Sequence, residues 1–121
     1  MLNMPEQEFK EVVREAMDGL PAEFSEKIQN VAVIVRDQPS KEEISSTGLD
    51  PELDTLFGLY DGLSLTEQSV SYPDLYPSRI TIFRLPLLEE CQNKKELINE
   101  IRLTVIHEIG HYFGLGEEDL P

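Results

Sequence analysis

Two histidines spaced four residues apart, His107 and His111, are the only histidines in this chain of 121 residues, and Glu108 follows the first of them. On an α-helix, residues four apart project from the same face. Two neutral imidazoles placed in this way can bind one Zn²⁺ ion. The adjacent glutamate can then act as general base on a water at the metal. The sequence therefore predicts a metal site near its C-terminal end, with His107 and His111 as ligands.

A third ligand is expected shortly after the second histidine, because catalytic zinc sites usually have three protein ligands and one open position. Gly114 favours a left-handed end to the helix, so the chain can turn back toward the metal there. Glu117, ten residues after His107, is a candidate third ligand. Glu118 and Asp119 are alternatives, since spacing alone does not separate three consecutive carboxylates.

Glu108 lies about 100° around the helix from His107, so it does not have to compete as a ligand. It can accept a proton from water at the metal and return that proton to a leaving amine. Bound zinc would lower the pKa of the water from about 15.7 to about 7 and polarise the scissile carbonyl. Gly110 costs a helix about 1 kcal/mol relative to alanine. We therefore expect a strand or loop to pass close to the helix at Gly110.

The helix that must carry these residues is the clearest element of the sequence. Asn93 and Glu96 form a capping-box pattern, and Gly114 is a natural stop, so the helix is predicted over residues 94–113. One face of this helix should be buried, because apolar residues recur on it at four-residue steps: Leu97, Ile101, Val105 and Ile109.

The rest of the chain predicts two further helices and three short strands. The first helix follows a capping pattern at Asn3 and Glu6 and ends at Gly19, and Pro21 opens the second. Residues 31–35 form a β-branched run typical of a buried strand. A second strand is expected at 56–60 and a half-exposed one at 79–84, ending at Pro86. Residues 36–55 are expected to be a loop that can include a helical turn near 51–56, and 64–78 to be irregular.

Composition limits the class of protein. The length favours one domain over residues 1–121, and the element pattern predicts an α+β fold with a small sheet packed against helices. The net charge of −14 argues against nucleic acid or an anionic membrane as partner and favours local accumulation of cations. No secretion signal or membrane span is apparent, so we expect a soluble, cytoplasmic monomer.

The segment from His107 to Glu117 resembles the His-Glu-x-x-His-x-x-Gly-x-x-ligand motif of the zincin metallopeptidases. More narrowly, the chain is similar to the small bacterial zincin-like metallopeptidases, or minimal zincins, at residues 31–35, 56–62, 77–86 and the C-terminal helix. The resemblance implies a compact zincin-like fold and one zinc ion. It also implies that His107 and His111 are ligands, that Glu108 is the catalytic base and that Glu117 occupies the third-ligand position, where the family more often has aspartate.

These observations predict a zinc-dependent peptidase acting on a peptide or protein, which pairs with strand 79–84 or strand 56–60. One alternative is a non-catalytic zinc-binding or protein-interaction module on the same scaffold. This alternative would explain why the given sequence shows neither the methionine turn of some larger zincins, since Met1, Met4 and Met17 all precede the motif, nor the later ligand helix of others. Another is a structural zinc site closed by Glu117 with Glu118 or Asp119.

Two other chemistries have weaker support. Cys91 precedes a helix start, which would lower the pKa of its thiol and favour a nucleophile. Both histidines are better explained as metal ligands, however, and the single cysteine forms no internal disulfide. The many carboxylates show no spacing that identifies a glycosidase pair.

Overall fold

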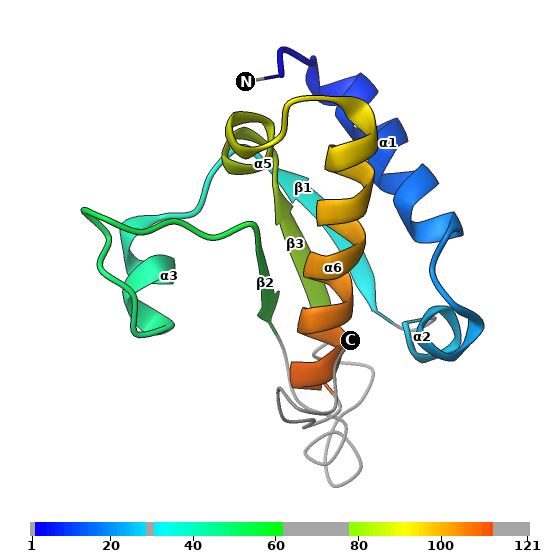
Figure 1. The fold of residues 1–121 in the computed structure, drawn as a ribbon. Helices are drawn as coiled ribbons and strands as arrows, with labels where there is room; N and C mark the ends of the chain where they lie inside the picture. The colour runs from blue at the N-terminus through cyan, green and yellow to red at the C-terminus, as the bar shows by residue number, and fades with distance from the viewer. Residues whose placement is uncertain (1, 29–30, 62–77, 113–121) are drawn as a thin grey trace, which may run out of the picture.

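The computed structural model describes residues 2–28, 31–61 and 78–112, with the backbone alone described at 61, 111 and 112. Five helices and three strands lie within these ranges (Figure 1). In chain order they are α1 (Glu6–Asp18), α2 (Ala22–Lys27), β1 (Ala32–Arg36), α3 (Lys41–Ser46), β2 (Gly58–Asp61), β3 (Arg79–Phe83), α5 (Arg84–Glu90) and α6 (Lys94–Tyr112).

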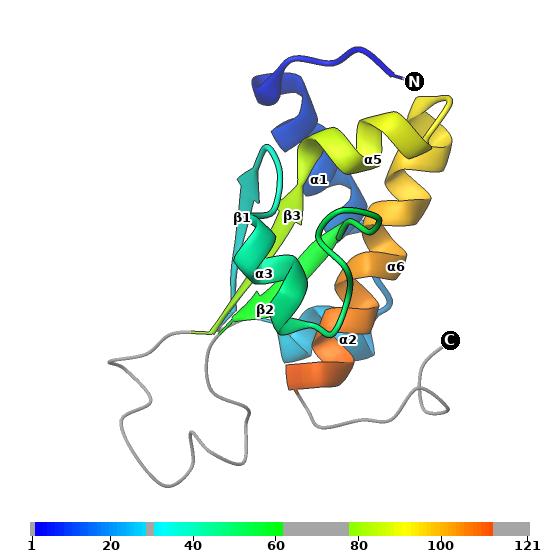
Figure 2. The same ribbon diagram turned by 90° about the vertical axis from the view of Figure 1, so that its left-hand side faces the viewer.

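The three strands form one mixed sheet in the order β1-β3-β2. β1 runs parallel to β3, with Ala32 opposite Arg79, and β2 runs antiparallel to β3, with Tyr60 opposite Ile80. Helices α1 and α6 cover one face of the sheet, and α3 lies over the other (Figures 1 and 2). The predicted α+β fold with a small mixed sheet packed against helices is therefore confirmed.

The long C-terminal helix is capped and buried as the sequence predicts. The side chain of Asn93 accepts a hydrogen bond from the N–H of Glu96 at 2.9 Å, and the Glu96 carboxylate accepts one from the N–H of Gln92. The predicted apolar stripe is fully buried against the sheet and α1: Leu97, Ile101, Val105 and Ile109. No described helix, α6 included, is long and apolar enough to cross a membrane.

The first helix differs from the prediction at its start. α1 begins at Glu6 after Pro5, and no side chain caps it, so the predicted capping box of Asn3 and Glu6 does not form. The fixed φ of proline favours the start of a helix without such a cap. The end at Gly19 is as predicted, and four residues of α1 lie inside the core: Phe9, Val12, Val13 and Ala16.

The burial of two strands is the reverse of the prediction. β1, predicted to be buried, lies at an edge, and Ile34 is 36% exposed. β3, predicted to be half-exposed, lies in the centre and is buried from Ile80 to Phe83. The reason is that both faces of β3 are covered. Ile80 and Ile82 pack in the main core, whereas the ring of Phe83 lies under the guanidinium of Arg36 at 5.4 Å.

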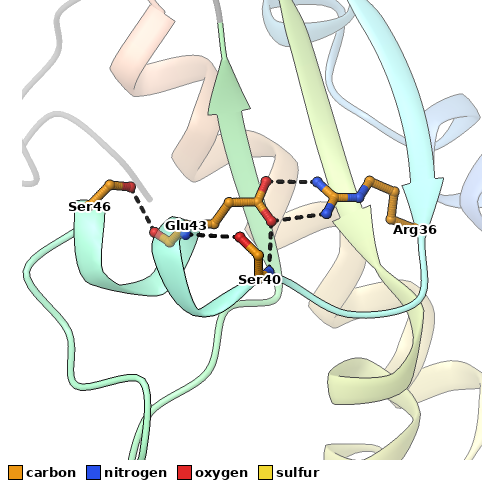
Figure 3. A network of polar contacts seen from close by, with 4 residues as sticks. All are labelled: Arg36, Ser40, Glu43 and Ser46. Atoms are coloured by element: carbon orange, nitrogen blue, oxygen red, sulfur yellow. Dashed lines mark hydrogen bonds and ion pairs between the residues drawn. The ribbon is translucent and has the colours of Figure 1, made fainter.

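Helix α3 lies within the segment predicted to be a loop. Ser40 and Glu43 form a complete capping box: the hydroxyl of Ser40 accepts from the N–H of Glu43, and the Glu43 carboxylate accepts from the N–H of Ser40 at 2.7 Å (Figure 3). Arg36, at the end of β1, makes a bidentate ion pair with that carboxylate at 2.7 and 3.0 Å. This network attaches α3 to the sheet.

Helix α5 is absent from the sequence prediction, in which Pro86 ends a strand. Pro86 is the third residue of α5, where a helix leaves its N–H groups without intrahelical partners. A proline is therefore tolerated there. The α5 residues Leu87 and Leu88 are buried in the core next to α6.

Candidate metal centre

The C-terminal half of α6 brings His107 and Glu108 to one cavity of about 270 Å³. The cavity is open to solvent and lies between α6 and the segment that enters β2. Besides His107 and Glu108, the side chains or backbone of four residues line it: Phe57, Gly58, Leu103 and Thr104. A half-buried imidazole and a carboxylate therefore share one small, accessible space.

Glu108 is buried to 9% exposure and is held by the edge strand of the sheet. The backbone N–H of Tyr60 donates a hydrogen bond to its Oε1 at 2.5 Å. The carbonyl of Phe57 accepts from the N–H of Phe83, so alternation along β2 directs the Tyr60 N–H away from β3 and toward the helix. A hydrogen bond to a carboxylate is stronger than one between neutral groups. It fixes the position of the Glu108 carboxylate at the cavity.

Gly58 allows β2 to approach α6 closely enough for that contact. A Cβ at this position would lie 2.5 Å from Cγ2 of Thr104 and 3.2 Å from the carbonyl oxygen of Thr81. Thr104 is itself oriented, because its hydroxyl donates to the carbonyl of Glu100 at 2.8 Å. The absence of a side chain at Gly58 is therefore a packing requirement of the strand–helix contact.

Only some of the predicted metal ligands lie within the part of the chain that the structure describes. His107 lines the cavity, and the backbone of His111 lies one turn further along α6. The side chain of His111 lies outside the described residues, as do Gly114, Glu117, Glu118 and Asp119. The described residues alone contain no group of three His, Cys, Asp or Glu side chains that could hold a metal. The donor chemistry present, an imidazole beside a buried carboxylate, fits a zinc site.

Cys91 is not the activated thiol that its place before a helix suggested. The residue is 1% exposed, and burial raises the pKa of its thiol to about 11, with further increases from the nearby carboxylates of Glu100, Glu96 and Glu90. A thiol in this setting stays protonated near neutral pH, and only the thiolate is an effective nucleophile. Cys91 is therefore a buried core residue.

Sequence reasoning did not find the partner of Glu108. The donor is the main-chain N–H of Tyr60, which carries no information about residue type, and it is 48 residues away in the chain. Gly58 gave a weak signal, because a glycine inside a predicted strand can mark a close approach of another element. Gly110, for which such an approach was predicted, is buried within α6.

Comparison with known protein families shows the family of this chain. Residues 28–121 match the family of zincin-like metallopeptidases, and the chain belongs to this family. Membership implies a zinc cofactor and metallopeptidase chemistry in general. Comparison with curated protein sequences gives no match.

Proposed function

We propose that this chain is a peptidase that binds one zinc ion through His107 and His111 and uses Glu108 as general base. The observation that carries the proposal is the placement of Glu108: its carboxylate is held by the Tyr60 N–H in a cavity that His107 also lines. Family membership supports zinc as the metal. The chain is expected to act as a monomer, without nucleic acid or membrane as partner.

The chemistry divides between the metal and the chain. When bound, zinc lowers the pKa of a water molecule and polarises the scissile carbonyl. Glu108 accepts the proton of the attacking water and returns it to the leaving amine.

Glu117 is proposed as the third ligand, with Glu118 and Asp119 as alternatives. Three single variants separate them: Glu117→Gln, Glu118→Gln and Asp119→Asn. Losing a true ligand should weaken zinc affinity at least about tenfold, since carboxylate ligation requires the ionised group. Isothermal titration with zinc measures the affinities. If all three variants bound zinc as tightly as the parent protein, a carboxylate ligand in this segment would be contradicted.

The substrate is proposed to lie along the outer edge of β2. Of the two strands predicted for this role, β3 is central and has neighbours on both sides, whereas β2 is an edge strand within the described ranges. Gly58 directs its backbone N–H and C=O to this edge, where they can pair with an extended peptide. Such pairing would place a peptide next to His107 and Glu108.

Metal analysis and an unbiased peptide-library digest test the proposal together. Purified protein should contain one zinc per chain, and the zinc-loaded form should cleave a subset of peptides that the chelated form leaves intact. Zinc without any cleavage would favour the non-catalytic module. A large loss of thermal stability on chelation, again without cleavage, would favour a structural zinc site. Absence of zinc binding would contradict the peptidase, the non-catalytic module and the structural zinc site alike.

A further inference from the structure

β1 presents the edge of the sheet opposite to β2, and its outer side has backbone groups directed away from the sheet. The N–H of Ala32 donates to the carbonyl of Ser78 at 3.0 Å, so Ala32 faces β3. In a parallel pair, alternate residues face the neighbouring strand. Val33 and Val35 therefore direct their N–H and C=O groups outward. Within the described ranges, no strand pairs with that side of β1.

A groove of about 470 Å³ runs along this edge, between β1 and α1. Its floor is apolar and its charged groups are both cationic, although the chain carries 24 acidic and 10 basic residues. Lys10 makes an exposed ion pair with Glu6 at 3.4 Å, and Arg14 makes none with any described residue. The side chains that form the groove include Lys10, Val13, Arg14, Met17, Val33 and Val35.

We propose that this edge binds an extended, acidic segment of another protein as an added strand. The outward groups of Val33 and Val35 would form the main-chain hydrogen bonds, which give affinity in this mode of recognition. Side chains of an added strand alternate between faces. Acidic residues at every second position would thus lie on the α1 side, near Lys10 and Arg14, and apolar residues between them would lie beside Ile34.

Charge favours this partner over a second copy of the chain. Two β1 edges related by a two-fold axis would bring the Lys10 and Arg14 side chains of both copies to the same interface, and like charges across a strand pair are destabilising. The same edge is free of Pro and of strand bulges among the described residues, features that proteins use to prevent pairing.

The first test uses a capped, fluorescein-labelled seven-residue peptide of alternating Glu and Val, with an alternating Lys and Val peptide as control. Fluorescence anisotropy should show saturable binding of the Glu–Val peptide and no binding of the Lys–Val peptide. In the complex, hydrogen exchange at the Val33 and Val35 amides should slow, while the Ala32 amide, already bonded to Ser78, should change little. Absence of binding, or binding without slower exchange at Val33 and Val35, would overturn the proposal.

Charge reversal gives the matched variants. Lys10→Glu combined with Arg14→Glu should weaken binding of the Glu–Val peptide at least about tenfold and create binding of the Lys–Val peptide. Lys41→Glu combined with Lys95→Glu, at two exposed cations outside the groove, changes the net charge by the same amount and should leave both affinities unchanged. Equal weakening by this control pair would show that net charge alone causes the effect and would contradict the proposal. If sedimentation showed that the protein forms dimers through the β1 edge, the occupant of this edge would be a second copy of the chain, and the proposal would be contradicted.

Discussion

The backbone N–H of Tyr60 in β2 donates a hydrogen bond to Oε1 of Glu108 in α6, and this contact links the sheet edge to the candidate metal centre. Tyr60 is placed there by its pairing with Ile80, and Glu108 by the buried stripe of α6. The proposed general base is therefore positioned by the strand along which we place the substrate.

Replacing Tyr60 by proline removes the donor and should lower kcat. The N–H points away from β3, so no sheet hydrogen bond is lost, and proline is tolerated at such edge positions. A hydrogen bond to a charged group contributes about 1.5–3 kcal/mol, so kcat should fall roughly 10- to 100-fold with KM and zinc content nearly unchanged. Steady-state kinetics measures kcat and KM, and metal analysis measures the zinc content.

Tyr60→Ala is the matched control, because it also loses the ring and the contact of the hydroxyl with Ser78 but keeps the N–H. Its kcat should stay well above that of Tyr60→Pro. Equal kcat in the two folded variants would show that the N–H does not position Glu108.

Gly58→Ala should destabilise the protein by about 1–3 kcal/mol, because the new methyl group meets Cγ2 of Thr104 at 2.5 Å. Urea unfolding measures the change. Thr104→Ser removes that methyl group but keeps the hydroxyl that bonds to Glu100. In the double variant, part of the stability lost through Gly58→Ala should return. Additive losses in the double variant would mean that the Gly58–Thr104 contact does not determine the strand–helix distance.

Local patterns were sufficient for the helix that carries the site. The four-residue repeat from Leu97 to Ile109 and the Asn93 cap are properties of neighbouring residues, and both predicted α6 correctly. The same kind of signal existed for α3, where Ser40 and Glu43 have capping-box spacing, but no long apolar repeat accompanies it.

Features that depend on distant segments were not predictable in this way. Whether a strand is central or at an edge depends on which partners pair with it, so the apolar run of β1 and the alternating pattern of β3 gave the reverse of the observed burial. The environment of Glu108 depends on a main-chain group of Tyr60. The family resemblance placed the motif, but not this contact.

Cys91 should react slowly with thiol reagents in the folded protein. Burial raises the pKa of its thiol to about 11, whereas an unfolded cysteine titrates near 8.5. Labelling with a disulfide reagent at pH 8 should be far faster in urea than in buffer. Since only the unfolded thiol loses its proton between about pH 8.5 and 11, the free energy of unfolding should also fall with rising pH in that window. Labelling as fast in buffer as in urea would contradict the burial of Cys91.

The attachment of α3 should weaken in acid. The hydrogen bonds from Arg36, and then those from Ser40, lower the pKa of the Glu43 carboxyl. A lowered pKa stabilises the fold above the unfolded value of about 4.3, and that contribution is lost as the pH falls toward the folded value. Because Arg36 is partly exposed, solvent screening limits the effect to about 1 kcal/mol or less.

Unfolding free energies measured from pH 6 down to pH 3 test this contribution. Glu43→Gln should reduce the acid dependence, whereas Glu42→Gln, at the exposed neighbouring position, should not. An unchanged acid dependence in Glu43→Gln would show that the ion pair with Arg36 does not stabilise the attachment.

The most direct test of the central claim is turnover by Glu108→Gln, measured together with its zinc content. Glutamine has the same shape and still accepts the Tyr60 hydrogen bond, but it cannot take a proton from water. We expect one zinc per chain and no detectable cleavage of a peptide that the parent protein cleaves. Glu100→Gln, on the same helix but outside the cavity, should cleave normally. Parental turnover by a zinc-loaded Glu108→Gln variant would contradict the assignment of Glu108 as the general base.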